Sequence, residues 1–273
     1  MVNILDPMLL KAIFGLFLAS LMAPIGALAT LRGISYLSAE VSHAALGGAA
    51  LGFFFIYLGF SFSNPFIFAL FFSLGVSLLT AYIGRRSGLE ATGSAIGSTL
   101  ALSMAIYALV RGLLPGEMKV MLDTYLIGDV LLLTYPDLIQ MFTVVLVSLI
   151  MFVLFYNEFI YLCFDYDGLE TMGLNAKLYD YLLFALLGFS GVVEAKSIGA
   201  FLVFAFMIAP AGIAKEITGS VSSFLFLSFL IAFLSSIVGL AISILFNLPT
   251  SGAVAIFPSS IYLVIVLKKM LFP

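Results

Sequence analysis

The stretch from Val221 to Phe246 contains no charged side chain. About 20 consecutive apolar residues let a helix cross the hydrocarbon core of a membrane, whereas a barrel strand alternates in polarity over about ten residues. The stretch therefore predicts a membrane-spanning helix. It is typical of the whole chain, because 63% of the 273 residues are hydrophobic and only 9% are charged. Soluble domains have about 25% charged residues, so this composition excludes a water-soluble globular protein.

Similar apolar blocks follow one another along the chain, separated by short polar connections. The expected number of spans is eight to ten, because the last block contains Pro258 and because only Glu194, Ala195 and Lys196 separate two of the blocks. The predicted fold class is all-α, a polytopic membrane helix bundle, with residues 1–273 in a single transmembrane domain. The nine candidate spans are 8–31, 41–60, 66–84, 91–110, 137–156, 178–193, 197–214, 222–246 and 253–267.

The distribution of Lys and Arg predicts the orientation, since cytoplasmic loops carry an excess of positive charge. With the N-terminus outside, seven of the 11 basic residues lie in the cytoplasm and four lie outside. The expected cytoplasmic residues are Arg32, Arg85, Arg86, Lys177, Lys215, Lys268 and Lys269. The expected outer residues are Lys11, Arg111, Lys119 and Lys196.

Several function classes are disfavoured by what the sequence lacks. A net charge of −3 provides no basic face for nucleic acid, and a single cysteine permits no internal disulfide. No phosphate-binding G-x-x-x-x-G-K-[ST] loop and no nucleophile–base pattern is evident, so we expect no enzyme activity and no bound cofactor. If ATP drives a process here, another polypeptide must bind it.

His43 is the only histidine, and Glu40 precedes it by three residues. Residues three apart share one face of a helix, and imidazole binds transition metals well. The pair is therefore a candidate metal contact. The alternative is a structural histidine that is hydrogen-bonded to a backbone carbonyl or to Glu40. Small residues between Ala44 and Gly52 follow, which predict either close helix packing or the lining of a substrate passage.

Three further features have two interpretations each. Asp129 lies in an apolar stretch too short to cross the membrane, so it is either a functional carboxylate or an interfacial one, and Gly128 permits a helix break there. The acidic segment from Asp165 to Gly173 predicts a brief cytoplasmic helix, either solvated or docked onto a partner. Pro210 predicts a helix kink or a gate.

Five stretches, taken in chain order, resemble motifs of the permease subunits of ABC importers for zinc, manganese or iron. Together they cover about residues 8–267. The second resembles Y-L-F-G-D-I-L, and the third F-D-P-E-x-A-R-A-L-G-L with Tyr166 in place of the proline. The stretches are Ser42–Gly52, Tyr125–Leu131, Phe164–Leu174 with the following Asp180–Leu183, Ile198–Ala211 and Pro249–Ala253.

The resemblance implies a role for individual residues. It makes His43, Glu40 and Asp129 candidate transient metal contacts, although the family commonly has an acid four residues before the histidine, where this chain has Ala39. Residues expected to couple to the ATPase are Asp165, Asp167, Glu170, Gly173 and Asn175. Residues expected at helix kinks or packing contacts are Gly199, Pro210 and Gly252.

The resemblance also implies partners and a location. The family's ATPase, which binds the ATP, and its extracytoplasmic metal-binding protein are separate chains, and the passage lies between two permease copies or sister permeases. The expected location is the plasma membrane of a prokaryote. The alternative function is an ATP-independent ion-coupled carrier or a membrane scaffold, in which Asp129 and Glu194 would serve ion coupling.

Overall fold

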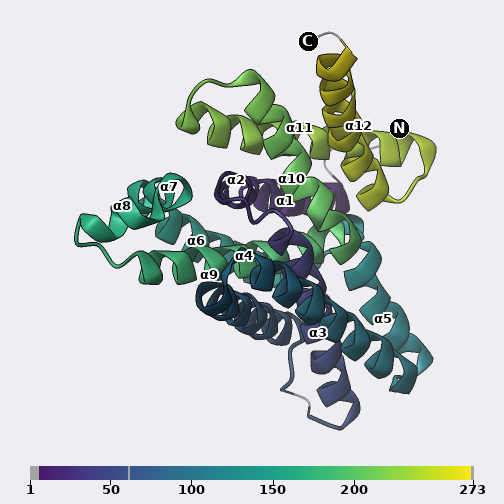
Figure 1. Ribbon diagram of the computed structural model, residues 1–273. Coiled ribbons are helices and arrows are strands. Elements are labelled where there is room, and N and C mark those ends of the chain that lie inside the picture. Colours follow the sequence, from purple (N-terminus) through teal and green to yellow (C-terminus); the bar gives the residue numbers. More distant parts are fainter. Residues whose placement is uncertain (1–5, 61, 272–273) are drawn as a thin grey trace.

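The computed structural model of the chain describes residues 6–60 and 62–271, apart from the side chains of residues 87–90, and contains no strand within them (Figure 1). Nine segments of this described part are long and apolar enough to cross a membrane, which confirms the predicted helix bundle. The elements are α1 (Pro7–Ser20), α2 (Ala23–Arg32), α3 (Leu37–Tyr57), α4 (Pro65–Leu113), α5 (Gly116–Ile127), η1 (Val130–Leu132), α6 (Tyr135–Leu154), α7 (Tyr156–Phe164), α8 (Tyr166–Thr171), α9 (Ala176–Ile198), α10 (Ala200–Ile217), α11 (Val221–Phe246) and α12 (Thr250–Leu271).

Two boundaries differ from the sequence prediction. The first span is interrupted at Leu21 and Met22, where α1 ends and α2 begins. The sixth and seventh spans separate at Gly199, whereas the sequence suggested a division at residues 194–196. The polar residues there do not end α9, because Lys196 has an ion-pair partner and the helix stops only where a glycine adopts a positive φ.

Helix α4 contains the third and fourth spans and folds back on itself. The Thr80 and Thr99 hydroxyls both donate to the same carboxylate oxygen of Glu40, although 19 residues of straight helix would separate them by about 28 Å. Gly84 also lies against Thr92. The chain therefore reverses its direction between Gly84 and Thr92. Helix α4 thus forms two arms, Pro65–Arg86 and Ala91–Leu113.

Helix α3 packs against both arms of α4 through its small residues. A Cβ atom on Gly48 would meet the backbone of Phe68 and Ala69 in the first arm, and one on Gly47 would meet the backbone of Ser103 in the second. The cluster from Ala44 to Gly52 thus serves close helix packing, the first of the two interpretations of its sequence.

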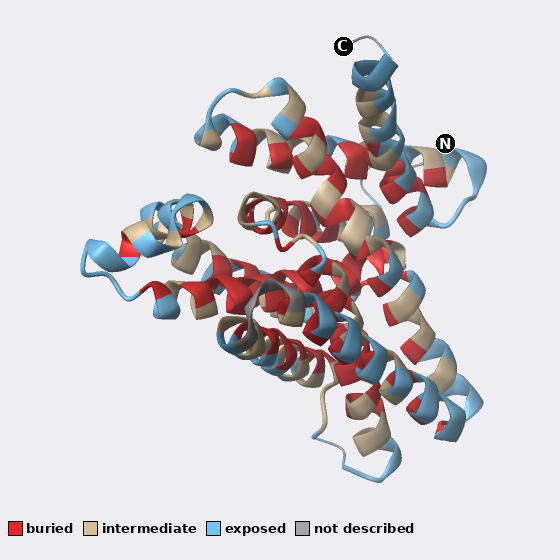
Figure 2. Ribbon diagram, viewed as in Figure 1, coloured by how far each residue is buried: buried red, intermediate tan, exposed pale blue. Residues whose placement is uncertain are grey.

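The core of the bundle lies around α9. This helix packs against α1, α3, α4, α6 and α10, and its spanning window is 78% buried, against 28% for α6. Figure 2 shows buried residues concentrated along the central helices, with α8 and the far end of α12 largely exposed. Helix α9 is therefore the central helix of the bundle.

The two ends of α9 are used below as reference points. Asp180 and Lys196 are 16 residues apart on this helix, about 24 Å. We call the end with Asp180, Arg32 and Arg85 the arginine end, and the end with Lys196 and Asp137 the lysine end. Figure 1 shows α7 and α8 at one edge of the molecule and α5 at the opposite edge.

Candidate functional site

His43 lies near the start of α3, half-buried, with its ring against Phe201 of α10. Its Nδ1 atom is 2.7 Å from the carbonyl oxygen of Ala39, one turn earlier. A carbonyl can only accept a hydrogen bond, so Nδ1 carries the proton, and Nε2 of the neutral ring keeps its lone pair. Metal-binding histidines are commonly held by such a hydrogen bond from the other ring nitrogen.

The side chains of Glu40 and His43 contact different parts of the bundle. The Glu40 side chain is fully buried between the arms of α4, where Oε1 accepts from Thr80 and Thr99, while Oε2 has no hydrogen-bond partner among the described residues. The structure therefore does not bring Glu40 and His43 to one point: only about 60° of helix rotation separates them, but Glu40 lies between the arms of α4 and the His43 ring lies against Phe201 of α10. Glu40 instead connects α3 with both arms of α4.

Asp129 lies outside the candidate spans, between α5 and the short 3-10 helix η1. One of its oxygens accepts from the Leu131 amide at 3.0 Å, so it caps η1. It also lines a pocket of about 490 Å³ at the lysine end, together with Thr124, Asn247 and Thr250. Residues of the second and the fifth motif, which are far apart in the sequence, thus meet in one pocket.

Gly128 and Gly199 are in direct backbone contact. A Cβ atom on Gly128 would overlap the backbone of Ile198 and Gly199, and one on Gly199 would overlap the backbone of Ile127 and Gly128. Both have positive φ angles, 75° and 91°, which favour glycine. The break that the sequence predicts at Gly128 and the kink it predicts at Gly199 are therefore one crossing point of two chain segments.

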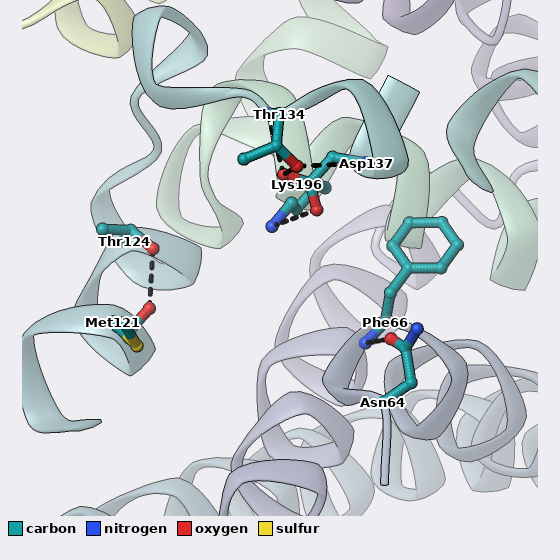
Figure 3. A network of polar contacts seen from close by, with 7 residues as sticks. All are labelled: Asn64, Phe66, Met121, Thr124, Thr134, Asp137 and Lys196. Atoms are coloured by element: carbon teal, nitrogen blue, oxygen red, sulfur yellow. Dashed lines mark hydrogen bonds and ion pairs between the residues drawn. The ribbon is translucent and has the colours of Figure 1, made fainter. Parts of the chain in front are cut away.

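A buried ion pair lies next to this crossing (Figure 3). Lys196 Nζ is 2.9 Å from Asp137 Oδ1, and both side chains are less than one-fifth exposed. Asp137 also accepts from Thr134 in the capping box that begins α6. The Lys196 ammonium lies 4.4 Å from the centre of the Tyr125 ring. These contacts connect α5, α6 and α9.

A second charged cluster forms the arginine end. Asp180 lies 3.4 Å from Arg32 Nη2 and 3.7 Å from Arg85 Nη1. Both guanidinium groups also face the ring of Tyr166, at 5.4 and 5.5 Å from its centre. A pocket of about 350 Å³ lies beside them. The cluster brings the end of α2, the reversal of α4 and the starts of α8 and α9 together.

Helix α8 confirms the brief helix predicted in the acidic segment. Asp165 caps it by accepting from the Gly168 amide at 2.8 Å, and Gly173 follows its end with φ of 78°. Asp167 and Glu170 are exposed, and Asn175 caps α9 by accepting from the Leu178 amide. The carboxylates of Asp167 and Glu170 are therefore accessible from outside the bundle.

The remaining predicted residues have different surroundings. Pro210 is buried inside α10, which continues through it. Gly252 lies in the first turn of α12, exposed, with open space where a Cβ atom would stand, so no close approach of the described chain requires a glycine there. Glu194 is fully buried in α9, and neither of its carboxylate oxygens has a hydrogen-bond partner among the described residues.

Sequence reasoning did not identify the two charged clusters or the Glu40 contacts. The signal was present, since Asp180 and Lys196 are charged residues inside an apolar span and such residues need partners. Their ion-pair partners lie 59 to 148 residues away along the chain and follow no local pattern. Within the described residues, no three His, Cys, Asp or Glu side chains gather to hold a metal ion.

Comparisons with known proteins agree with this architecture. The manganese import system permease protein ScaB of Streptococcus parasanguinis is 30% identical, over 88% of this chain and 82% of its own length. The high-affinity zinc uptake system membrane protein ZnuB of Haemophilus influenzae is 25% identical, over 98% and 99%. The structure of PsaBC from Streptococcus pneumoniae in complex with Fab superposes with a TM-score of 0.82 at 26% identity, covering 96% of this chain and 91% of that one.

The family comparison covers nearly the whole sequence. A sequence model of the ABC 3 transport family matches residues 5–269, which include the first eight candidate spans and all but the last two residues of the ninth. The resemblance found in the five motifs is thereby confirmed. This chain is a multi-pass membrane permease that belongs to the ABC 3 transport family.

Proposed function

We propose that the chain is the permease subunit of an ATP-driven importer of divalent transition metal ions, with manganese as the first candidate. The names of ScaB and ZnuB support a metal as substrate. Manganese suits a passage that offers a single imidazole and otherwise oxygen donors, because Mn²⁺ accepts carboxylate and carbonyl ligands readily. Zinc and iron remain the competing substrates.

The geometry of His43 carries this proposal. Its Nδ1 donates to the Ala39 carbonyl, so the ring is oriented and Nε2 is available to a cation. A single imidazole binds a passing ion weakly, and an ion that is bound weakly can leave again. His43 therefore acts as a transient contact for the metal. Asp129, which lines the pocket at the lysine end, is the proposed earlier contact.

We assign a different partner to each end of the bundle. The arginine end faces the cytoplasm, where the exposed Asp167 and Glu170 of α8 dock onto an ABC ATPase that binds the ATP. The lysine end faces outward and receives the ion from a metal-binding protein. A second copy or a sister permease completes the passage. The chain itself binds no cofactor and catalyses no reaction.

Reconstituted vesicles test the proposal. The chain is purified with its ATPase, combined with the binding protein, and assayed for ATP-dependent uptake of radioactive manganese, zinc and iron. We expect uptake of manganese. His43→Ala and the bulkier His43→Leu should both lower uptake about tenfold while the complex still assembles, because both remove the nitrogen ligand. Normal uptake by both variants would refute the role of His43.

The docking role of α8 has its own test. Reversing the charges at Asp167 and Glu170 to lysine should lower metal uptake while ATP hydrolysis continues, because the docking contact is lost. Normal coupling in this variant would refute the assignment. A control with the same reversal at the half-buried Glu158 of α7 should couple normally.

One observation supports the alternative of an ion-coupled carrier. Glu194 is a fully buried acid without a hydrogen-bond partner among the described residues, and such residues in membranes often serve ion coupling. In that case uptake would proceed without the ATPase, and Glu194→Gln would abolish it. Uptake that requires ATP and persists in Glu194→Gln would exclude the alternative.

A further inference from the structure

Tyr166 is the residue through which α8 contacts the charged cluster of the arginine end. The centre of its ring lies 5.4 Å from Arg32 Cζ and 5.5 Å from Arg85 Cζ, so one aromatic ring contacts two cations. The same two guanidinium groups share the carboxylate of Asp180. Two like charges are thus held side by side by one carboxylate and one ring.

We propose that Tyr166 is a positioning residue that transmits movement of α8 to α2, α4 and α9 through the Arg32 and Arg85 guanidinium groups. This inference rests on the proposed function, in which α8 docks onto the ATPase. It goes beyond that function because it names the residues that connect the docking helix to the membrane bundle. These residues are Tyr166 and its charged neighbours Arg32, Arg85 and Asp180.

The position of Tyr166 on α8 suits this role. The tyrosine is the first residue of the helix, directly after the capping Asp165, and Glu170 lies one turn further on, where it is exposed to a partner. Leu169 of the same helix is fully buried. A capped and anchored helix of six residues moves as one piece, so displacement at Glu170 also displaces the Tyr166 ring.

The contacts around Tyr166 allow such a movement. Arg85 Nη1 is 3.7 Å from Asp180, beyond hydrogen-bond distance, and the bond from Arg32 to Asp180 is long at 3.4 Å. Attraction between a cation and a ring has weak angular dependence compared with a hydrogen bond. The adjoining pocket of about 350 Å³ leaves space for the guanidinium groups to shift.

The aromatic ring is a particular feature of this chain. The motif that the segment resembles has proline at this position, and a proline has no π face for a guanidinium group. The two arginines lie at the end of α2 and at the reversal of α4, and Asp180 lies in the second turn of α9. Loss of the ring would therefore remove the contact of α8 with both arginines at once, while Leu169 stays buried.

Cys163 provides a reporter that is independent of transport. It is the only cysteine, it lies on α7 three residues before Tyr166, and its thiol is 3.6 Å from the Leu28 carbonyl of α2. Burial raises the pKa of this thiol to about 12, so it alkylates slowly while the α7–α2 contact is closed. A change at that contact should change the alkylation rate.

The test compares three variants in the complete complex with ATPase and binding protein. Tyr166→Leu removes the ring face but keeps an apolar side chain, Tyr166→Phe keeps the ring, and Tyr161→Leu changes a half-exposed tyrosine outside the cluster. The readouts are manganese taken up per ATP hydrolysed, and Cys163 alkylation with and without nucleotide trapped on the ATPase.

We expect Tyr166→Leu to lower uptake per ATP about fivefold and to abolish the effect of nucleotide on Cys163 alkylation. Tyr166→Phe and Tyr161→Leu should behave like the wild type. Normal coupling in Tyr166→Leu would overturn the inference, as would equal losses in the leucine and phenylalanine variants. A wild-type complex without ATP-driven uptake would refute the proposed function instead, which separates the two failures.

Discussion

The two ends of α9 hold charged side chains in different ways. At the lysine end, Lys196 and Asp137 form a short ion pair of 2.9 Å, and Asp137 is fixed further by the capping box of α6. At the arginine end, Asp180 faces two guanidinium groups at 3.4 and 3.7 Å next to a pocket. The ion pair at the lysine end is therefore short and directional, whereas the charge contacts at the arginine end are longer.

The backbone increases this difference. Gly128 and Gly199 meet beside the lysine end with no room for a side chain, so two chain segments are locked together there. The reversal of α4 at the arginine end has no equivalent contact of positive-φ glycines within the described residues. The comparison indicates that the lysine end of α9 is more tightly constrained than the arginine end.

The largest expected effect comes from breaking the glycine crossing. Gly199→Ala should lower the free energy of unfolding by about 4 kcal/mol, because the new Cβ overlaps the backbone of α5 and because alanine is strained at φ of 91°. Thermal unfolding in detergent measures the change. Gly59→Ala is the control, since Gly59 has a φ of 95° but open space around it, and should cost about 1–2 kcal/mol. Equal losses in both variants would show that the crossing adds nothing.

A slightly smaller effect is expected from the buried ion pair. Lys196→Met leaves the Asp137 carboxylate without its partner and should lower the free energy of unfolding by about 3 kcal/mol. The double variant Lys196→Met with Asp137→Asn should recover more than half of that loss, because asparagine carries no charge and still accepts from Thr134. The same thermal measurement checks both. A double variant less stable than Lys196→Met would contradict the explanation.

The sequence predicted most of the fold because the membrane restricts it strongly. Apolar length alone placed all nine spans, and the predicted span 222–246 differs from α11 by one residue. Hydropathy failed at α9, where Glu194 and Lys196 looked like a loop. Hydropathy scores Lys196 as polar whether or not it has an ion-pair partner, and this partner, Asp137, lies 59 residues away in the sequence. The single-domain organisation stays a prediction.

The candidate site was less predictable than the fold. The helical spacing that suggested a shared role for Glu40 and His43 was right about the helix but did not show which neighbour each side chain meets. Glu40 meets two threonines that come together only because α4 reverses. Such a reversal leaves no periodic signal, so local patterns identify the residues of a site more readily than their partners.

A moderate effect is expected at the arginine end. Arg32→Met should lower the free energy of unfolding by only about 1 kcal/mol, because Arg85 still faces Asp180 and can approach it. Comparison with Lys196→Met by thermal unfolding directly tests the contrast between the two ends. A loss at Arg32 as large as that at Lys196 would mean that the arginine end is as tightly built as the lysine end.

The smallest expected effect concerns a short but exposed ion pair near the lysine end. Arg111 Nε and Nη2 lie 2.7 and 2.8 Å from the two Asp123 oxygens, and the Tyr107 hydroxyl donates to the same carboxylate. The hydrogen bonds from Arg111 hold the pKa of Asp123 below its ordinary value. Because the folded pKa is lowered, this stabilisation is present above the ordinary pKa of about 4 and disappears as pH falls through the folded pKa.

Asp123→Asn should therefore lower stability by about 1 kcal/mol at pH 7, since exposed pairs contribute little even with good geometry. The difference from the wild type should begin to shrink as pH falls below about 4 and disappear once the pH is below the lowered pKa of the folded carboxyl. Thermal unfolding at several pH values measures this, with the exposed Glu117→Gln on the same helix as a control that should change neither value. A loss as large as that of Lys196→Met would mean that short distances alone make this end rigid. The expected small loss would assign the rigidity to burial, since Lys196 and Asp137 have similar distances but little contact with solvent.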